Sequence, residues 1–153
     1  MIVDNRITEY LHSLEKSRGE LLDTIEKKAV EEGVPIIRSE TAALLRSLTA
    51  ALRPENILEI GTAVGYSALQ MCQVMPLNCH ITTIEKYEKR IPEAKENFKK
   101  AGEESRITFL EGDADMWFIC TKTAQQLLPQ ERNISLTPKV YVQTENNIIT
   151  QKL

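Results

Sequence analysis

Hydrophobic positions follow two different spacings along this chain. In roughly the first fifty residues they recur every three to four positions, which predicts helices over residues 7–32, with a break at Gly19, and over 39–52. From residue 56 onward, short apolar runs alternate with further segments of helical spacing, separated by turn residues. These segments predict strands over 56–60, 80–84 and 106–110, and helices over 66–74 and 91–101.

The alternation of strands and helices predicts the fold class. Each strand leads into a helix and each helix into the next strand, through short links. This order is typical of right-handed β–α–β units, which build a parallel sheet. A nearly continuous apolar run such as 56–60 suits a strand that is buried on both faces. We therefore expect an α/β fold, preceded by helices, over residues 1–115.

The segment before the third predicted helix is expected to be extended. Pro35 disfavours a helical conformation at the residue before it, so residues 34–37 should leave the preceding helix after Gly33. Ser39 is a good candidate for the N-cap of the next helix, and Pro54 for its end.

The last part of the chain follows another pattern. None of the last 41 residues is glycine, no aspartate follows Asp115, and residues 116–153 carry four basic and two acidic side chains. We treat residues 116–153 as a divergent tail rather than an independent domain. The tail is expected to hold short strands over 139–143 and 147–150, around a turn at 145–146, and a short helix over 121–128.

Composition and charge exclude several classes of protein. The net charge is −3 and 42% of the residues are hydrophobic, which is ordinary for a globular domain. No run approaches the roughly 18 apolar residues of a membrane span, and the first residues are too polar for a signal peptide, so we expect no membrane partner and a cytoplasmic location. Three cysteines without C-x-x-C spacing are typical of free thiols in a reducing compartment. Cys79 and His80 lack further ligands at zinc spacing, so no metal site is expected.

Basic side chains gather around one predicted helix. Glutamates are interspersed among them, so we expect a solvated, charged helix face rather than a surface for nucleic acid. The basic residues are Lys86, Lys89, Arg90, Lys95, Lys99 and Lys100.

The most informative motif is a glycine-punctuated turn at residues 61–65. It follows the first predicted strand and leads into a helix, whose start exposes unpaired backbone N–H groups. Gly61 allows a ligand to approach the backbone closely, and Gly65 allows the helix to pack against the strand. The spacing is G-x-x-x-G and not the G-x-G-x-x-G of dinucleotide-binding folds, which favours a ligand without a pyrophosphate. By itself the turn is equally consistent with a tight connection that binds nothing.

Acidic residues follow the other two strands. Glu85 comes at the end of the second strand, where a carboxylate can accept hydrogen bonds from both hydroxyls of a ribose. Asp113 and Ala114 follow the third strand, and Glu59, just inside the first, could reach an ammonium group or order the turn. Because the carboxyl ends of parallel strands lie at one edge of a sheet, these residues together predict a nucleoside pocket. Taken singly, Glu85 could be a surface residue and Asp113 a helix cap.

These motifs resemble those of class I S-adenosylmethionine-dependent O-methyltransferases, and within them the catechol/caffeoyl-CoA O-methyltransferase-like family. Residues 57–67 (Ile-Leu-Glu-Ile-Gly-Thr-Ala-Val-Gly-Tyr-Ser) are similar to the first family motif, and 82–85 and 110–114 to its second and third strand ends. The segment 34–37 is similar to the lead-in before the first motif. The resemblance covers roughly residues 5–115 and is nearest to the small bacterial branch that methylates 5-hydroxyuridine in tRNA.

The resemblance implies a Rossmann-like fold, an S-adenosylmethionine cofactor and a role for each motif. The turn would carry the methionine part of the cofactor on its backbone groups, Ser67 would hydrogen-bond that part, and Ile37 would line the pocket. Glu85 would hold the ribose, and Asp113 with Ala114 would flank the adenine. No catalytic residue is assigned. The complete set of expected cofactor-binding residues is Ile37, Glu59, Gly61, Thr62, Ala63, Gly65, Tyr66, Ser67, Glu85, Asp113 and Ala114.

The chain departs from the family after the third strand. Relatives continue with an Asp-Ala-Ala-Lys motif and an Asp-Asn pair, which hold the divalent metal, expected to be Mg²⁺, that lowers the pKa of the acceptor hydroxyl. Neither motif is found here, so we expect the C-terminal half to be truncated or replaced and the Mg²⁺ ligands to be missing. The strand at 56–60 would then have an open edge, which the tail or a second chain must cover if the protein is to fold well.

Several functions are compatible with this pattern. The leading hypothesis is an S-adenosylmethionine-dependent O-methyltransferase, with tRNA as the acceptor that the resemblance implies and a homodimer as the assembly common among relatives. The alternatives are a non-catalytic module that binds a nucleoside or oligomerises, and an inactive fragment. A dehydrogenase is disfavoured by the missing dinucleotide fingerprint.

Overall fold

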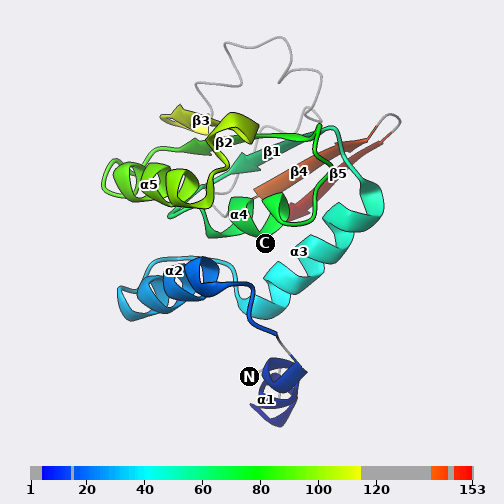
Figure 1. Ribbon diagram of the computed structural model, residues 1–153, viewed down its shortest axis with the longest axis vertical. Coiled ribbons are helices and arrows are strands. Elements are labelled where there is room, and N and C mark those ends of the chain that lie inside the picture. Colours follow the sequence, from blue (N-terminus) through cyan, green and yellow to red (C-terminus); the bar gives the residue numbers. More distant parts are fainter. Residues whose placement is uncertain (1–4, 15, 115–138, 145–146, 153) are drawn as a thin grey trace.

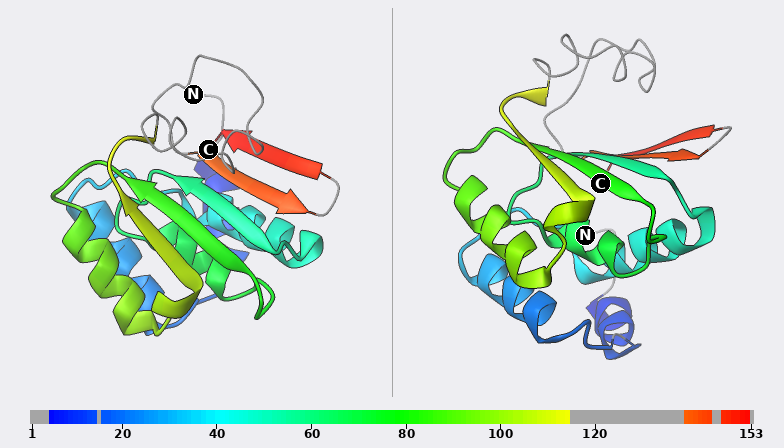
Figure 2. Two further views of the ribbon diagram at one scale, coloured as in Figure 1. Left: turned by 90° about the horizontal axis from the view of Figure 1, so that it is seen from above. Right: turned by 45° about the horizontal axis from the view of Figure 1, so that its top comes forward.

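A mixed sheet with helices packed on one of its faces forms the body of the molecule (Figures 1 and 2). The computed structural model describes residues 5–14, 16–114, 139–144 and 147–152. The helices are α1 (Asn5–Leu14), α2 (Glu20–Glu31), α3 (Ser39–Leu52), α4 (Tyr66–Cys72), α5 (Ile91–Ala101) and the 3-10 turn η1 (Glu104–Arg106). The strands are β1 (Asn56–Ile60), β2 (His80–Glu85), β3 (Ile107–Glu111), β4 (Lys139–Thr144) and β5 (Asn147–Lys152).

The strand order in the sheet is β3-β2-β1-β4-β5. The first three strands are parallel, as predicted, and Ile81 lies opposite both Ile57 and Ile107 in the register. The two strands predicted in the tail are also present, but β4 is antiparallel to β1, and β5 is antiparallel to β4. The sheet is therefore mixed and not purely parallel. The helix expected over 121–128 lies outside the described residues.

The edge of β1 that faces away from β2 is covered by β4. The pairing runs from Asn56 opposite Gln143 to Ile60 opposite Lys139, the full length of β1. Of the alternatives expected for this edge, the structure shows the one in which the tail covers it. A buried strand needs partners for its N–H and C=O groups on both sides, and the tail provides them here.

The described helices lie on one face of the sheet, and the core forms between them (Figure 2). Ile57 and Ile81 from the strands meet Leu69, Met71 and Phe98 from the helices, all of them buried. On the opposite face, side chains such as those of Leu58 and Ile60 are only half-buried. The expectation that β1 is buried on both faces is thus met on the helical face alone.

Helix ends follow local chemistry with one exception. Gly19, with φ of 104°, separates α1 from α2, and Arg53 adopts a left-handed conformation just before Pro54, where α3 ends. Ser39 was expected to cap α3, but it is already the first helical residue; Arg38 is in the N-cap position and makes no side-chain cap hydrogen bond. The capping prediction is therefore wrong by one residue.

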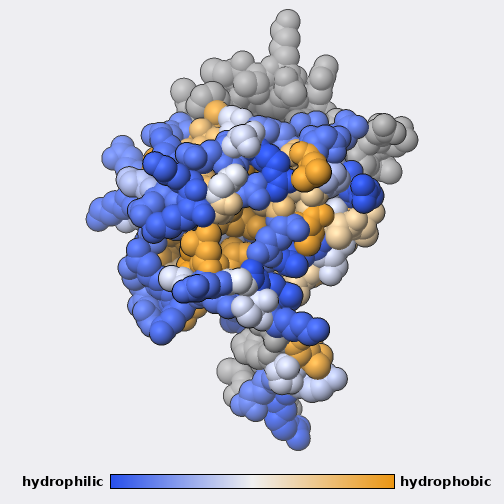
Figure 3. Space-filling view, viewed as in Figure 1, coloured by the Kyte–Doolittle hydropathy of each residue, from blue (hydrophilic) through white to orange (hydrophobic). Residues whose placement is uncertain are grey.

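Helix α1 stands apart from the body in Figure 1, and several of its apolar side chains are exposed, including those of Ile7, Tyr10 and Leu14. On the face seen in Figure 3, hydrophilic side chains predominate and apolar ones gather between α2 and the helices α4 and α5. Within the described part of the chain, no helix combines the length and the apolar character needed to cross a membrane.

Candidate functional site

The three strand ends singled out by the sequence meet at one edge of the sheet. The backbone N–H of Gly61, after β1, donates to the carbonyl of Ile84 in β2 at 2.9 Å. The N–H of Gly112, after β3, donates to the carbonyl of Glu85 at 2.8 Å. The turn, Glu85 and the residues after β3 are thus joined by backbone hydrogen bonds, as the parallel arrangement predicts.

The turn between β1 and α4 takes an unusual backbone path. Gly61, Ala63 and Gly65 all have positive φ angles, of 90°, 48° and 84°. The left-handed conformation is strained for alanine, and such strain often marks functional sites. Gly65 was expected to allow packing against the strand, but its close neighbour is the ring of Phe98 in α5.

Glu85 holds the strained part of the turn. Its side chain is only 8% exposed. One carboxylate oxygen accepts the N–H of Ala63 at 2.7 Å, and the other accepts the N–H of Tyr87 at 2.8 Å. A carboxylate has about four lone-pair sites, so two of them stay available for further donors such as the hydroxyls of a ribose. The position therefore fits the role expected for Glu85.

Glu59 lies beneath the turn and ties it to the sheet and to α4. It shares the helical face of β1 with Ile57, because side chains two apart on a strand point the same way, and it is 1% exposed. Its carboxylate accepts hydrogen bonds from the hydroxyls of Ser67 and of Thr83, the latter at 2.6 Å. The Thr83 hydroxyl is in turn 2.6 Å from that of Thr62 in the turn. Of the two expected roles, ordering the turn is the one these contacts support.

Burial dominates the electrostatics of Glu59. Removal from water raises the pKa of its carboxyl group to about 7. The hydrogen bonds from Ser67 and Thr83 oppose this rise, and the negative charge of Glu85 adds slightly to it. Glu59 is therefore a buried acid whose charge changes near neutral pH.

A cleft opens beside the turn. It is shallow, with a cavity volume of about 10 Å³. Tyr66, which is buried, is one of its lining residues, and its hydroxyl donates a hydrogen bond to Glu26 of α2 at 2.7 Å. The residues lining the cleft are Pro35, Ile36, Ile37, Gly61, Thr62, Ala63, Tyr66 and Ser67, which brings the lead-in segment against the turn as expected.

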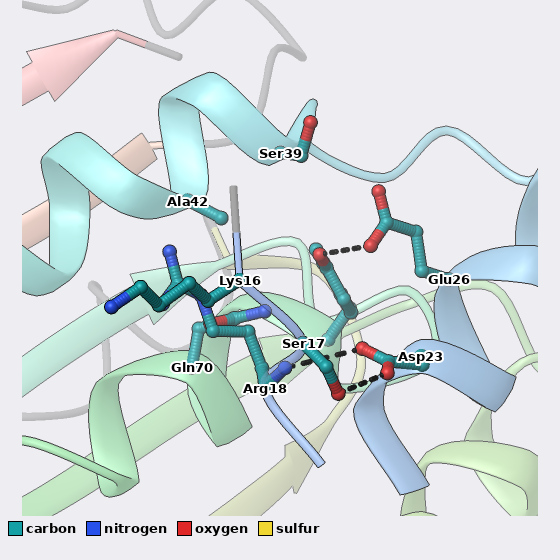
Figure 4. A pocket seen from close by; sticks show the side chains of 9 residues that line it. Lys16, Ser17, Arg18, Asp23, Glu26, Ser39, Ala42 and Gln70 are labelled. Carbon is teal, nitrogen blue, oxygen red and sulfur yellow. Dashed lines mark hydrogen bonds between the residues drawn. The ribbon is translucent and has the colours of Figure 1, made fainter. Parts of the chain in front are cut away.

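Two neighbouring hollows extend this region toward the N-terminal helices. One has a cavity volume of about 410 Å³ and shares Ile36 and Ile37 with the cleft. The other, shown in Figure 4, has a cavity volume of about 160 Å³ and lies between α2, α3 and α4, where Asp23 accepts hydrogen bonds from Ser17 and Arg18. Its lining is mostly polar and includes both positively and negatively charged side chains, so it does not favour a ligand of either charge.

Asp113 and Ala114 lie where the sequence placed them, just after β3. The Asp113 carboxylate forms an ion pair with Lys86 at 3.1 Å, and both side chains are well exposed. Lys86 follows β2 and was not expected at this site. The pair spans the ends of β2 and β3, beside the place foreseen for the adenine.

Asn97 supports the turn through a hydrogen bond that the sequence did not predict. It is buried on α5 and donates through its side-chain amide to the carbonyl of Val64 in the turn, at 2.9 Å. A signal for it exists in the sequence. Asn97 is a polar residue on the apolar stripe that Ala94 and Phe98 form on this helix, and such a residue must find a hydrogen-bond partner inside.

Several of the basic residues around α5 form ion pairs with nearby carboxylates, as expected for a solvated helix face. Lys95 pairs with Glu111, and Lys100 pairs with Glu96 at 2.7 Å. Arg90 lies within 3.8 Å of Glu93. These carboxylates offset much of the positive charge that a nucleic acid would need.

No divalent metal fits the described residues. Among them there is no group of three or more histidine, cysteine, aspartate or glutamate side chains that could hold one. Cys72 and Cys79 are free and buried, as expected for thiols of this chain, and burial raises the pKa of the Cys72 thiol to about 12. Because the described residues include no such group of ligands, we assign no step of the reaction to a metal.

Comparison with known proteins gives a consistent family. The sequence profile of the O-methyltransferase family matches residues 12–129. The catechol O-methyltransferase of Niastella koreensis is 28% identical over 71% of this chain and 50% of its own length. A solved structure of a candidate caffeoyl-CoA O-methyltransferase from Staphylococcus aureus is 32% identical, with a TM-score of 0.64 over 74% of this chain and 53% of that one.

A more distant structure shares the fold. It is the O-methyltransferase TomG from Streptomyces achromogenes, solved in complex with SAM; it is 23% identical, with a TM-score of 0.66 over 85% of this chain and 58% of TomG. The chain thus spans about half the length of the relatives it matches.

Proposed function

The chain belongs to the O-methyltransferase family, and we propose that it binds S-adenosylmethionine at the strand ends described above and serves methyl transfer to a hydroxyl oxygen. The observation that carries the proposal is the Glu85 carboxylate. It is buried at the end of β2 and hydrogen-bonded to the strained turn, with lone pairs left for a ribose.

The residues around the cleft fit the parts of this cofactor. Glu85 would accept the ribose hydroxyls, and Asp113 with Ala114 would flank the adenine. The methionine part would lie over the turn, near Ile37 and Ser67, which both line the cleft. When bound, the cofactor would supply a methyl group on a sulfonium, and the protein's task would be to position the acceptor oxygen for in-line attack.

The acceptor and the assembly are proposed from the family resemblance. Hydroxyuridine in tRNA is proposed from the motif resemblance alone, because the ion-paired surface of α5 lends it no support. The cytoplasmic location and the homodimer stay predictions.

A second candidate function is nucleoside binding without transfer. Two observations favour it: β4 runs antiparallel along β1, and the described residues offer no metal cluster. Binding and transfer must therefore be tested separately.

The experiment is a calorimetric titration of the full chain with S-adenosylhomocysteine, followed by a transfer assay. We expect binding by the unmodified chain and by the control Glu88→Gln, which changes an exposed residue. Glu85→Gln should weaken binding at least tenfold, because the amide replaces one acceptor oxygen with a donor group that faces backbone N–H groups. Absence of binding would contradict the proposal.

The transfer assay uses labelled S-adenosylmethionine and catechol, the acceptor in the name of the Niastella koreensis relative, with and without added Mg²⁺. Methylated catechol would support the enzyme. Binding without any transfer would favour the second candidate.

A further inference from the structure

The polar pocket between α2, α3 and α4 is separate from the cleft at the turn (Figure 4). Its cavity volume of about 160 Å³ is below the roughly 300–1,000 Å³ typical of pockets for drug-sized ligands, so it suits a small molecule. Of the described residues that line the cleft, Tyr66 alone also lines this pocket. A ligand here would therefore occupy a place other than the one proposed for the cofactor.

Gln70 of α4 brings a buried amide to the wall of this pocket. The residue is 1% exposed, and its side-chain oxygen accepts a hydrogen bond from Nη1 of Arg46 at 3.4 Å. A guanidinium can only donate, so the amide oxygen must face Arg46, and the NH₂ group lies on the other side of the amide. Among the described residues that NH₂ group has no hydrogen-bond partner, and Figure 4 shows the Gln70 side chain in the lining of the pocket. A buried donor of this kind is costly unless a ligand or a water accepts from it.

Positive charge gathers on the side of the pocket where Gln70 lies. Lys16 and Arg18, in the link between α1 and α2, belong to the lining. Within the described part of the chain, no ion pair joins either of them to a carboxylate. Burial lowers the pKa of the Arg46 guanidinium below its ordinary value, and the positive charge of Arg18 lowers it further. Because these cations repel one another, this side of the pocket favours a carboxylate group.

The α2 side of the pocket has the opposite character. One oxygen of the Glu26 carboxylate accepts the hydroxyl of Tyr66 at 2.7 Å, and that bond leaves the second oxygen for another donor. Ser39, at the start of α3, adds a hydroxyl to the lining. Figure 4 shows Glu26 and Ser39 on one side and Lys16 with Gln70 on the other. The pocket therefore offers acceptors at one end and donors at the other.

Asp23, the other carboxylate of the lining, serves the structure of the pocket. One of its oxygens accepts the hydroxyl of Ser17 and the other accepts the backbone N–H of Arg18. These bonds fasten residues 16–18 to α2, so the two cations of the link are held beside the pocket before any ligand arrives. Such preorganisation lowers the entropic cost of binding.

We propose that this pocket binds a small free amino acid as its zwitterion. The carboxylate of the ligand accepts from the NH₂ group of Gln70 and pairs with Arg18, and the ammonium group of the ligand donates to Glu26. A simple anion would satisfy the donor end alone and would be repelled by the Glu26 carboxylate, whereas a zwitterion matches both ends. The inference goes beyond the proposed function, because the site lies outside the cofactor cleft.

The test is a calorimetric titration of the full chain with L-alanine, L-glutamine and propionate. Propionate differs from L-alanine by the ammonium group alone, and L-glutamine tests a longer side chain. Each titration is repeated in the presence of saturating S-adenosylhomocysteine. We expect at least one of the two amino acids to bind and propionate to bind at least about tenfold more weakly. Saturating S-adenosylhomocysteine should change the Kd of the amino acid less than about twofold, because the two sites are separate.

Two variants and a matched control locate the binding site. Glu26→Gln removes the negative charge but keeps an oxygen for the Tyr66 hydroxyl, and Gln70→Leu removes the buried amide. Each should raise the Kd of the amino acid at least about tenfold. The control is Lys27→Gln, which changes an exposed charge on α2 beside Glu26 and should alter the Kd less than about twofold.

Four results would overturn the inference. They are the absence of binding by both amino acids, binding of propionate as tight as that of the amino acid, loss of amino-acid binding when S-adenosylhomocysteine saturates the cleft, and an unchanged Kd in Glu26→Gln. The first three need no variant, so the inference stays testable even where Gln70→Leu does not fold. If S-adenosylhomocysteine itself does not bind, the proposed function fails, and the titrations with the amino acids, propionate and the variants still decide this inference.

Discussion

The ring of Phe98 occupies the space in which Gly65 would carry a side chain. A Cβ atom at Gly65 would lie 2.5 Å from Cε1 and 2.9 Å from Cζ of Phe98. Phe98 is buried in the core and has little room to move away. Gly65 also has a φ of 84°, so glycine is required at this position both by space and by backbone conformation.

Gly65→Ala should therefore destabilise the protein more than a glycine substitution at a similar φ angle elsewhere. We expect a loss of about 2–4 kcal/mol in the free energy of unfolding, from overpacking and backbone strain together. Gly33→Ala is the matched control, because Gly33 has a φ of 65° but nothing within 4 Å of the added atom; it should cost about 1 kcal/mol. Urea denaturation measures both. An equal loss of unfolding free energy in the two variants would show that the Phe98 ring moves aside to make room for the added atom.

The hydrogen bond from Asn97 to Val64 should stabilise the turn. Asn97→Ala leaves a carbonyl without its partner, so we expect a loss of about 1–3 kcal/mol in the free energy of unfolding and weaker binding of S-adenosylhomocysteine. The control is Asn78→Ala at an exposed loop position, which should change stability by less than about 0.5 kcal/mol. Thermal melts with and without ligand test this, and equal behaviour of the two variants would count against the role of Asn97.

The pairing of β4 with β1 can be tested by its backbone hydrogen bonds. Val142 lies opposite Ile57, near the middle of the pairing. Val142→Pro disrupts this ladder because proline has no N–H and is excluded from central strands, whereas Val142→Thr keeps the backbone donor. We expect faster amide hydrogen exchange in Val142→Pro at those β1 positions that bond to β4, with β3 unchanged. Unchanged exchange throughout β1 would contradict the pairing.

The stability of the protein should depend on pH through Glu59. Its pKa is about 7 in the folded state against an ordinary value of 4.5, so the folded state binds the proton more tightly. The stabilising effect of the proton is complete below pH 4.5 and is lost as the pH rises to about 7. The loss amounts to about 3 kcal/mol.

Glu59→Gln removes the titrating group and isolates its effect. The difference in the free energy of unfolding between the two proteins should shift by about 3 kcal/mol between pH 4.5 and pH 8, in favour of the variant at the higher pH. Chemical denaturation over this pH range measures the shift. A difference that does not change with pH would mean that Glu59 has an ordinary pKa.

The sequence by itself determined the local elements and their order. The spacing of apolar residues placed the α-helices and strands of residues 5–114 to within a few positions, because amphipathic periodicity reflects which face is buried, but it did not predict the 3-10 turn η1. It also placed Gly61, Glu85 and Asp113 at the ends of successive strands, and parallel strands bring such ends to one edge. That is why the outline of a nucleoside pocket could be predicted before any contact was known.

Tertiary structure alone decided which groups touch. That Glu59 is hydrogen-bonded to Ser67 and Thr83, that Phe98 excludes a side chain at Gly65, and that β4 runs antiparallel along β1 are all contacts between different elements. Periodicity shows which face of an element is apolar, but not which residue of another element meets it. Strand direction in the tail likewise depends on which edge is free and not on the pattern within the strand, since period-two alternation is the same for parallel and antiparallel neighbours.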